Sequence, residues 1–164
     1  MEREEFAQRI TQMHCTLYRI CTSQLSCAQD REDAVQEALK KAWERRRQLR
    51  NDALLQAWVI RILLNECHKI QRQRKRLLLT DRLMDPDAPA PEAAPEGLLL
   101  RQALRQLPEK LRVPLVLHYL EGYGVQETAR ILRLPPGTVK TRMRAGRAQL
   151  KLLLDEEVFE DENK

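Results

Sequence analysis

The sequence predicts an all-α fold made of two small helical domains, joined by an acidic and proline-rich linker. Apolar residues recur at helical spacing, no run alternates apolar and polar residues as a half-buried strand would, and there are only five glycines. Positive charge lies in two blocks, with a net charge of +6 over residues 1–78 and +8 over residues 99–154. Each block is therefore expected to form a separate unit that faces a polyanion.

The N-terminal block, residues 1–78, is expected to form three helices. The first has a core-facing stripe that consists of Phe6, Ile10, Met13, Leu17 and Ile20. The second is expected to begin with Asp30 as its N-cap. Its inward side holds Val35, Ala38, Leu39, Ala42 and Trp43, and its outward side holds Asp33, Gln36, Glu37, Lys40 and Lys41. On the pattern alone, such an outward side is most often only solvated.

The third helix, from about Asp52 to Leu78, separates an apolar side from a basic side. The apolar side holds Leu55, Val59, Ile62, Leu63 and Ile70. The basic side, within about 100° of arc, holds Arg61, Asn65, His68, Lys69, Arg72 and Arg76. Trp58 falls among these polar residues, and an aromatic ring beside a cationic track is how opened nucleic acid is held. The alternative is that Trp58 packs under the preceding loop or against the end of another helix, and periodicity favours neither interpretation.

Residues 79–98 are expected to be a flexible, extended linker. The stretch TDRLMDPDAPAPEAAPEG has four prolines and almost no large apolar residues, so it cannot bury enough surface to fold alone. Its net charge is negative, as is that of the predicted acidic tail, residues 155–164.

The C-terminal block, residues 99–154, ends in a predicted helix-turn-helix. The short helix VQETARIL buries Val125, Thr128, Ala129 and Leu132, and Pro135 and Pro136 are expected to stop it. The second helix has an apolar stripe that consists of Val139, Met143, Gly146, Leu150 and Leu153. Another side holds Lys140, Arg144, Arg147 and Lys151, with Thr141 at its edge. Because no acid occurs from Thr138 to Lys151, this side can offer its cations to phosphates and guanine edges.

The four cysteines are expected to be small apolar fillers. Cys15, Cys21 and Cys27 are six residues apart, which turns each by about 240° from the last around a helix, and no CxxC or HxxxH spacing occurs. No metal, cofactor or catalytic residue is expected, since no paired carboxylates, nucleophile and base, or phosphate loop is present. With no signal peptide and no apolar run near the ~20 residues of a membrane span, a cytoplasmic chain without membrane insertion is expected.

Two parts of the chain resemble a known family. DREDAVQEALKKAW and AWVIRILLNECHKIQRQRKR resemble region 2 of a bacterial sigma factor, and ALRQLPEKLRVPLVLHYLEGYGVQETARILRLPPGTVKTRMRAGRAQLKLLL resembles region 4. The two occur in the family's order. A short linker replaces a folded region 3, and no acidic extension precedes region 2, so the resemblance is to the extracytoplasmic-function group.

The resemblance implies a non-catalytic, monomeric specificity subunit of RNA polymerase. In the family, the second helix binds the clamp helices of the beta-prime subunit, a role that falls on Asp33, Gln36 and Glu37. The third helix reads and opens the minus-10 element of promoter DNA, a role that falls on Trp58, Arg61, Asn65, His68, Lys69 and Arg72. The loop RRRQLRNDALL takes a flipped base in family members.

Region 4 of the family reads the minus-35 element through the second helix of its motif. Here that role falls on Thr138, Lys140, Thr141, Arg142, Arg144 and Arg147. The beta flap of the polymerase would hold the apolar side of this region, and an anti-sigma factor is a further implied partner. Two other classes stay open: a stand-alone helix-turn-helix regulator with an N-terminal sensor domain, and a redox or metal sensor built on the cysteines and histidines.

Two residues depart from the family's pattern. Gly124 stands where the family usually has serine at the cap of the first motif helix, so a weaker cap is expected. Pro114 removes one backbone donor, so its helix is expected to start late or bend there.

Overall fold

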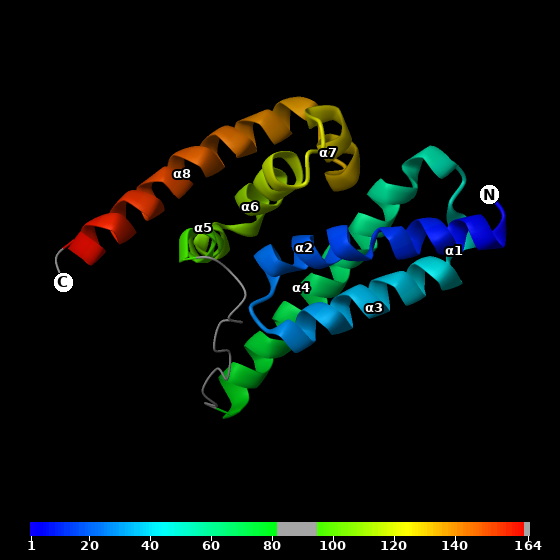
Figure 1. The fold of residues 1–164 in the computed structure, drawn as a ribbon, viewed down its shortest axis with the longest axis horizontal. Coiled ribbons are helices and arrows are strands. Elements are labelled where there is room, and N and C mark those ends of the chain that lie inside the picture. Colours follow the sequence, from blue (N-terminus) through cyan, green and yellow to red (C-terminus); the bar gives the residue numbers. More distant parts are fainter. Residues whose placement is uncertain (82–94, 163–164) are drawn as a thin grey trace. The chain divides into compact units, whose positions relative to one another are not determined.

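The computed structural model describes residues 1–81 and 95–162, and these divide between two compact units, Met1–Ala90 and Pro91–Lys164 (Figure 1). Within the described residues every regular element is helical and no strand forms. The prediction of an all-α fold is therefore confirmed. The exact limits of the predicted domains, linker and tail stay a prediction.

The first unit consists of α1 (Arg3–Gln12), α2 (His14–Gln24), α3 (Ala28–Glu44) and α4 (Leu55–Asp81). Two short 3-10 turns, Arg46–Gln48 and Asp52–Leu54, connect α3 to α4. The prediction of three helices is wrong because the first one is broken at Met13. The N–H of Met13 donates to the carbonyl of Ile10, three residues back, at 3.1 Å, and this tighter turn separates α1 from α2.

The break between α1 and α2 leaves the apolar stripe intact. All five residues predicted to face the core from this segment are buried. The two helices follow nearly one line in Figure 1, and both contact α3. The periodicity was therefore sufficient to predict burial but not the local change in hydrogen bonding.

Helix α4 is buried over a wider arc than its apolar stripe predicts. Leu55, Val59 and Leu63 are buried as expected, but Ile60, Leu64 and Cys67 are buried too. The reason is that α4 contacts both α2 and α3, so two neighbours cover it instead of one.

The prediction that Asp30 is the N-cap of its helix is wrong. Helix α3 begins at Ala28, its N-cap is Cys27, and no side chain caps it. Asp30 is the third helical residue, and its carboxylate forms an ion pair with Arg74 of α4. The neighbouring Arg31 is buried and donates to the carbonyls of Leu25 and Ser26 at 2.9 and 2.6 Å, which stabilises the turn between α2 and α3.

All four cysteines are free thiols. Cys21 of α2 and Cys67 of α4 are buried with their sulfur atoms 3.7 Å apart, as fillers between these helices. Cys15, in contrast, is exposed, and Cys27 is half-buried at the start of α3. The described part of the chain contains no cluster of three or more histidine, cysteine or acidic side chains suited to a metal ion.

The second unit consists of α5 (Pro95–Gln106), α6 (Glu109–Leu115), a wider π-helical turn η3 (Val116–Leu120), α7 (Val125–Leu132) and α8 (Pro136–Glu162). Its core cluster draws on every one of these elements: Leu104, Leu107, Leu115, Val116, Ala129, Val139 and Met143. Gly146 is buried where α8 crosses α6. A Cβ atom there would lie 2.9 Å from Cδ1 of Leu115 and 3.2 Å from the carbonyl oxygen of Leu111, so glycine permits this close approach.

The two departures from the family pattern have structural outcomes. Helix α6 starts at Glu109, before Pro114, so the expected late start is wrong; instead the helix widens into η3 two residues after the proline. A proline cannot donate to the carbonyl four residues back, which favours such an irregular turn. Gly124 has no side chain to cap α7, but its N–H donates to the carboxylate of Glu127 at 2.8 Å, which is half of a capping box.

Helices extend into the segment that was predicted to be a flexible linker and into the predicted acidic tail. Helix α4 continues to Asp81, α5 begins at Pro95, and α8 continues to Glu162. The centre of the predicted linker, residues 82–94, and the last two residues of the tail lie outside the described residues. None of the described helices is both long enough and apolar enough to cross a membrane.

Candidate nucleic-acid and polymerase interfaces

The helix-turn-helix is present over α7 and α8, but its turn differs from the prediction. Helix α7 ends at Leu132 because Arg133 adopts a left-handed conformation, with φ of 55°, before either proline is reached. The N–H of Leu134 then donates to the carbonyl of Ala129 at 3.0 Å and closes the end of the helix. Pro136 is the first residue of α8, a position where a missing N–H costs nothing.

The buried side of the motif fixes the position of α8. Val139, Met143 and Gly146 are buried and Leu150 and Leu153 half-buried, as the apolar stripe predicts. In α7, Thr128 and Ala129 are buried as expected, and so is Ile131, which the prediction missed. Val125 and Leu132, which were also predicted to be buried, are half-buried.

The basic side of α8 is accessible over about three turns. The exposed residues on it are Lys140, Thr141, Arg144, Arg147 and Lys151. Thr138 and Arg142 are half-buried, and the hydroxyl of Thr141 donates to the carbonyl of Gly137 at 3.0 Å. The predicted minus-35 residues therefore differ in how freely a ligand can reach them: four are exposed and two are half-buried.

Arg147 has a neighbour that the sequence analysis did not find. Its guanidinium donates to the hydroxyl of Tyr119 at 2.9 Å and lies 5.9 Å from the centre of that ring. Tyr119 belongs to η3 and is 56% exposed. The local pattern gave no signal for this pair because its members are 28 residues apart and η3 lacks the period of an α-helix.

Along α4, the polar side is accessible as predicted. Asn65, Lys69 and Arg72 are exposed, whereas Arg61 and His68 are half-buried. Trp58 is half-buried, and its ring meets that of the buried Phe6 edge to face, with 6.4 Å between centres. Trp58 thus packs partly against α1 and is partly accessible to solvent.

A second aromatic residue, Trp43, lies among cations at the end of α3. The guanidinium of Arg46 is 4.4 Å from the centre of its ring and that of Arg3 is 5.6 Å away. Beside them is a cavity of about 330 Å³, lined among others by Phe6 and Arg47. The prediction placed Trp43 in the core, yet it is only half-buried. Its contact with Arg46 could have been predicted, because residues three apart along a helix lie on the same side.

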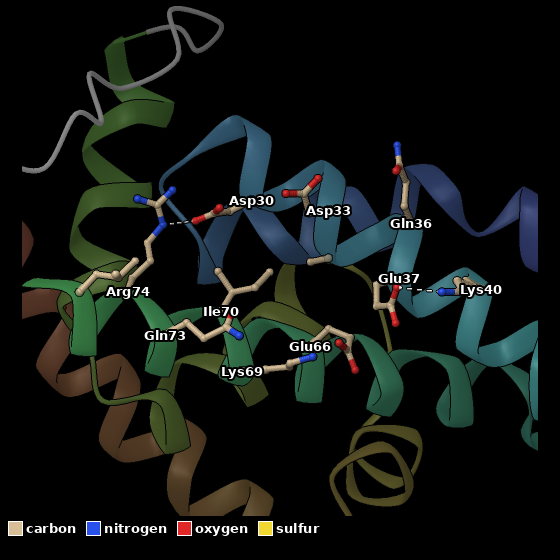
Figure 2. A pocket seen from close by; sticks show the side chains of 12 residues that line it. Asp30, Asp33, Gln36, Glu37, Lys40, Glu66, Lys69, Ile70, Gln73 and Arg74 are labelled. Carbon is tan, nitrogen blue, oxygen red and sulfur yellow. Dashed lines mark hydrogen bonds and ion pairs between the residues drawn. The ribbon is translucent and has the colours of Figure 1, made fainter.

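The polar face of α3 borders a groove of about 760 Å³ between α3 and α4 (Figure 2). Asp33 and Gln36 are exposed, and in Figure 2 both side chains extend away from α4. Glu37 is half-buried and forms ion pairs with Lys40 and Lys41 at 3.9 and 3.7 Å. Of the three predicted polymerase-binding residues, Asp33 and Gln36 are therefore the more accessible.

An ion pair that the sequence pattern did not reveal lies beside the groove, and one of its two residues is buried. Glu66 of α4 is 7% exposed, and its carboxylate accepts a hydrogen bond of 2.6 Å from Lys41 of α3. Its partner is 25 residues away, so no helical spacing could reveal the pair. Together with Arg74 and Asp30, it joins α3 to α4 along the groove.

Two family models match the chain, one in each unit. Residues 10–77 match Sigma-70 region 2, and residues 97–150 match Sigma-70, region 4. The chain is 30% identical over 162 residues to the ECF RNA polymerase sigma factor SigM of Mycobacterium tuberculosis. The aligned residues cover 93% of this chain and 79% of SigM. It is 26% identical to the ECF RNA polymerase sigma factor SigW of Bacillus subtilis, over 92% of this chain and 89% of SigW.

Solved structures show the same architecture. The sigma factor RpoE of Bartonella quintana, in complex with the anti-sigma factor NepR, matches with a TM-score of 0.78 and 26% identity, covering 93% of this chain and 98% of RpoE. CnrH, in complex with the cytosolic domain of CnrY, matches with a TM-score of 0.74 and 25% identity, covering 94% of this chain and 90% of CnrH.

Proposed function

Because this chain belongs to the extracytoplasmic-function group of the sigma-70 family and directs promoter-specific transcription initiation, we propose that its two units divide promoter recognition between them. The second unit reads the duplex minus-35 element, and the first unit melts the minus-10 element and binds core polymerase. Sigma factors are non-catalytic regulatory proteins, so the chain acts through binding alone. The observation that carries this proposal is the exposed, acid-free side of α8, mounted on a buried apolar stripe.

Minus-35 reading is assigned to the N-terminal half of α8. The N-terminal residues of a recognition helix are the ones that reach base edges in the major groove. Arg144 and Lys140 are exposed there, and either can donate to O6 and N7 of guanine. Thr138, Thr141 and Arg142 flank them and complete the surface. The buried contacts of Val139 and Met143 support this role, because a reading helix must be held rigidly.

Minus-10 melting is assigned to the polar side of α4. Asn65, Lys69 and Arg72 offer an exposed polar and cationic track, with Arg61 and His68 beside it. Trp58 supplies an aromatic surface held in place by its edge contact with Phe6. Stacking of an unstacked base on such a ring contributes ~1–3 kcal/mol, which favours the opened strand over the duplex.

Protein partners are assigned to the remaining surfaces. Asp33, Gln36 and Glu37 bind the clamp helices of the beta-prime subunit, and the apolar side of the second unit binds the beta flap. Because RpoE of Bartonella quintana is bound by an anti-sigma factor, an anti-sigma factor is also the proposed regulator of this chain. The chain acts as a cytoplasmic monomer within the holoenzyme.

Run-off transcription tests the proposed function. The full chain is added to core polymerase from its own bacterium and to a library of promoter fragments. We expect transcripts from a subset of templates that share two short sequence elements at a fixed spacing, and none when the chain is omitted. Sequence-specific binding of the chain to duplex DNA without any such transcript would favour the stand-alone regulator instead.

A further inference from the structure

Tyr119 and Arg147 bring donors from two elements to one point on the surface. The guanidinium of Arg147, on α8, donates to the hydroxyl of Tyr119, on η3, at 2.9 Å, and it also lies 5.9 Å from the ring centre. Both side chains are exposed. The ring of Tyr119 packs edge to face against that of His118, with 4.8 Å between their centres. His118 is in turn fixed by its Nδ1 atom, which lies 2.7 Å from the carbonyl oxygen of Tyr123.

The pair has donors to spare. A guanidinium has five N–H groups, and the contact with Tyr119 uses one of them. Since the tyrosine oxygen accepts that bond, its own O–H remains able to donate. The remaining N–H groups of Arg147 and the O–H of Tyr119 can therefore converge on a single anion with several acceptor oxygens. A phosphodiester has this chemistry, because its two unbridged oxygens share one negative charge.

The position of Arg147 along α8 favours a phosphate over a base. Arg147 is the twelfth residue of α8, about 16 Å along the axis from Pro136 at 1.5 Å per residue. Base edges in the major groove are contacted by the N-terminal residues of a recognition helix. Arg144 is one turn nearer to the N-terminal end. Arg147 is tied to Tyr119, a residue outside the helix-turn-helix, so it would lie at the rim of a surface that reads bases, beside the DNA backbone.

We propose that Tyr119 and Arg147 form a two-residue site for one backbone phosphate next to the minus-35 element, with Tyr119 holding Arg147 in place. The proposal rests on the proposed function of the second unit. It separates Arg147 from the base-reading residues with which the sequence analysis grouped it: Arg147 contributes affinity and fixes the register of α8, and Arg144 contributes specificity.

The test measures binding of the reconstituted holoenzyme to a promoter found by run-off transcription, with each phosphate near the minus-35 element replaced in turn by a neutral methylphosphonate. On unmodified DNA, Arg147→Ala should weaken binding roughly tenfold or more, by the same factor for every base sequence, and lower the dependence on salt by about one counterion. Tyr119→Phe should weaken binding by a smaller factor. When the phosphate that the pair contacts is the one neutralised, both variants and the unmodified protein should bind that DNA equally well.

Controls separate a local contact from a general effect. Lys110→Ala removes an equal charge from an exposed residue of α6, and it should show no special phosphate in the scan. Arg147→Lys keeps the charge but not the fork, so it should keep the salt dependence and lose part of the affinity. If Arg147→Ala instead changes the preference for one base pair, and no single methylphosphonate removes its defect, Arg147 reads a base and the proposal is wrong. If the unmodified holoenzyme forms no promoter complex, the proposed function has failed and not this site alone.

Discussion

The partly buried pair of Lys41 and Glu66 gives a sharp prediction for a single substitution. Glu66 is 7% exposed and its 2.6 Å bond to Lys41 joins α3 to α4. Replacing Lys41 with methionine would leave a buried carboxylate without this partner. The side chain of Lys41 is 21% exposed, so water offsets part of the loss, and the free energy of unfolding should fall by about 1–3 kcal/mol.

Chemical denaturation of the full chain measures this loss. Lys40→Met is the matched control, since Lys40 is 64% exposed at its side chain and its pair with Glu37 spans 3.9 Å; its effect should stay within about 0.5 kcal/mol. Equal effects of the two substitutions would contradict a structural role for the partly buried pair.

Gly146 makes the second prediction at this scale. A Cβ atom at this position would come within 2.9 Å of the buried Leu115 side chain and 3.2 Å of a backbone oxygen of α6. Gly146→Ala should therefore destabilise the second unit by about 1 kcal/mol, because overpacking outweighs the gain in helix propensity. Gly137→Ala has open space around the new methyl group and should be neutral or stabilising. Thermal unfolding of both variants gives the comparison, and a stabilised Gly146→Ala variant would show that α6 and α8 do not approach this closely.

At the scale of elements, the sequence was sufficient to predict which side of most helices is buried. Helical periodicity reports burial directly, which is why the stripes of α1, α2 and α8 match the structure. It could not predict that α4 is covered from two sides, because that depends on α2 and α3 together. Nor could it predict that Asp30 binds Arg74, a residue 44 positions away, instead of capping its own helix.

The candidate sites show the same limit. The basic side of α8 was predictable because it lies on one helix, and its accessible residues agree with the pattern. The contact between Tyr119 and Arg147 was not, since it joins two elements through an irregular turn. Sites made by one element follow from periodicity, whereas sites made between elements require the fold.

The polar face of α3 gives a prediction for a whole element. Asp33→Lys together with Glu37→Lys should abolish co-purification of the chain with core polymerase, because the reversed charges lie on the face assigned to the clamp helices. Helical content measured by circular dichroism should not change, since Asp33 is exposed and the ion pairs of the half-buried Glu37, at 3.9 and 3.7 Å, are long.

Glu4→Lys together with Glu5→Lys, on the exposed face of α1, is the control with the same change in charge. That variant should still co-purify with core polymerase. If the α3 variant also does so, the assignment of Asp33 and Glu37 to the polymerase is wrong.

For the whole molecule, the charge distribution predicts dependence on core polymerase. The two basic blocks share the chain with acidic segments, of net charge −4 over residues 79–98 and −5 over residues 155–164. We expect these segments to compete with DNA for the basic surfaces. Gel-shift at moderate salt should therefore show weak binding of promoter duplex by the chain alone, and core polymerase should be required for tight binding. Tight, sequence-specific binding by the chain alone would favour a stand-alone regulator.

Promoter opening separates the proposed roles of the two units. Arg144→Ala should weaken the closed and open complexes alike, by ~1–3 kcal/mol for a lost base contact. Asn65→Ala and Trp58→Ala should instead form the closed complex normally and fail to open it. Asn65 is exposed, so its substitution tests melting without disturbing the core.

The measurement is permanganate reactivity of thymines in the minus-10 region, for holoenzymes on an intact promoter and on one mismatched there beforehand. The Asn65 and Trp58 variants should leave these thymines unreactive on the intact promoter and regain stable complexes on the mismatched one. The Arg144 variant should not be rescued in this way. Normal opening by a folded Trp58→Ala and Asn65→Ala chain, or loss of the closed complex in both, would contradict the assignment of melting to α4.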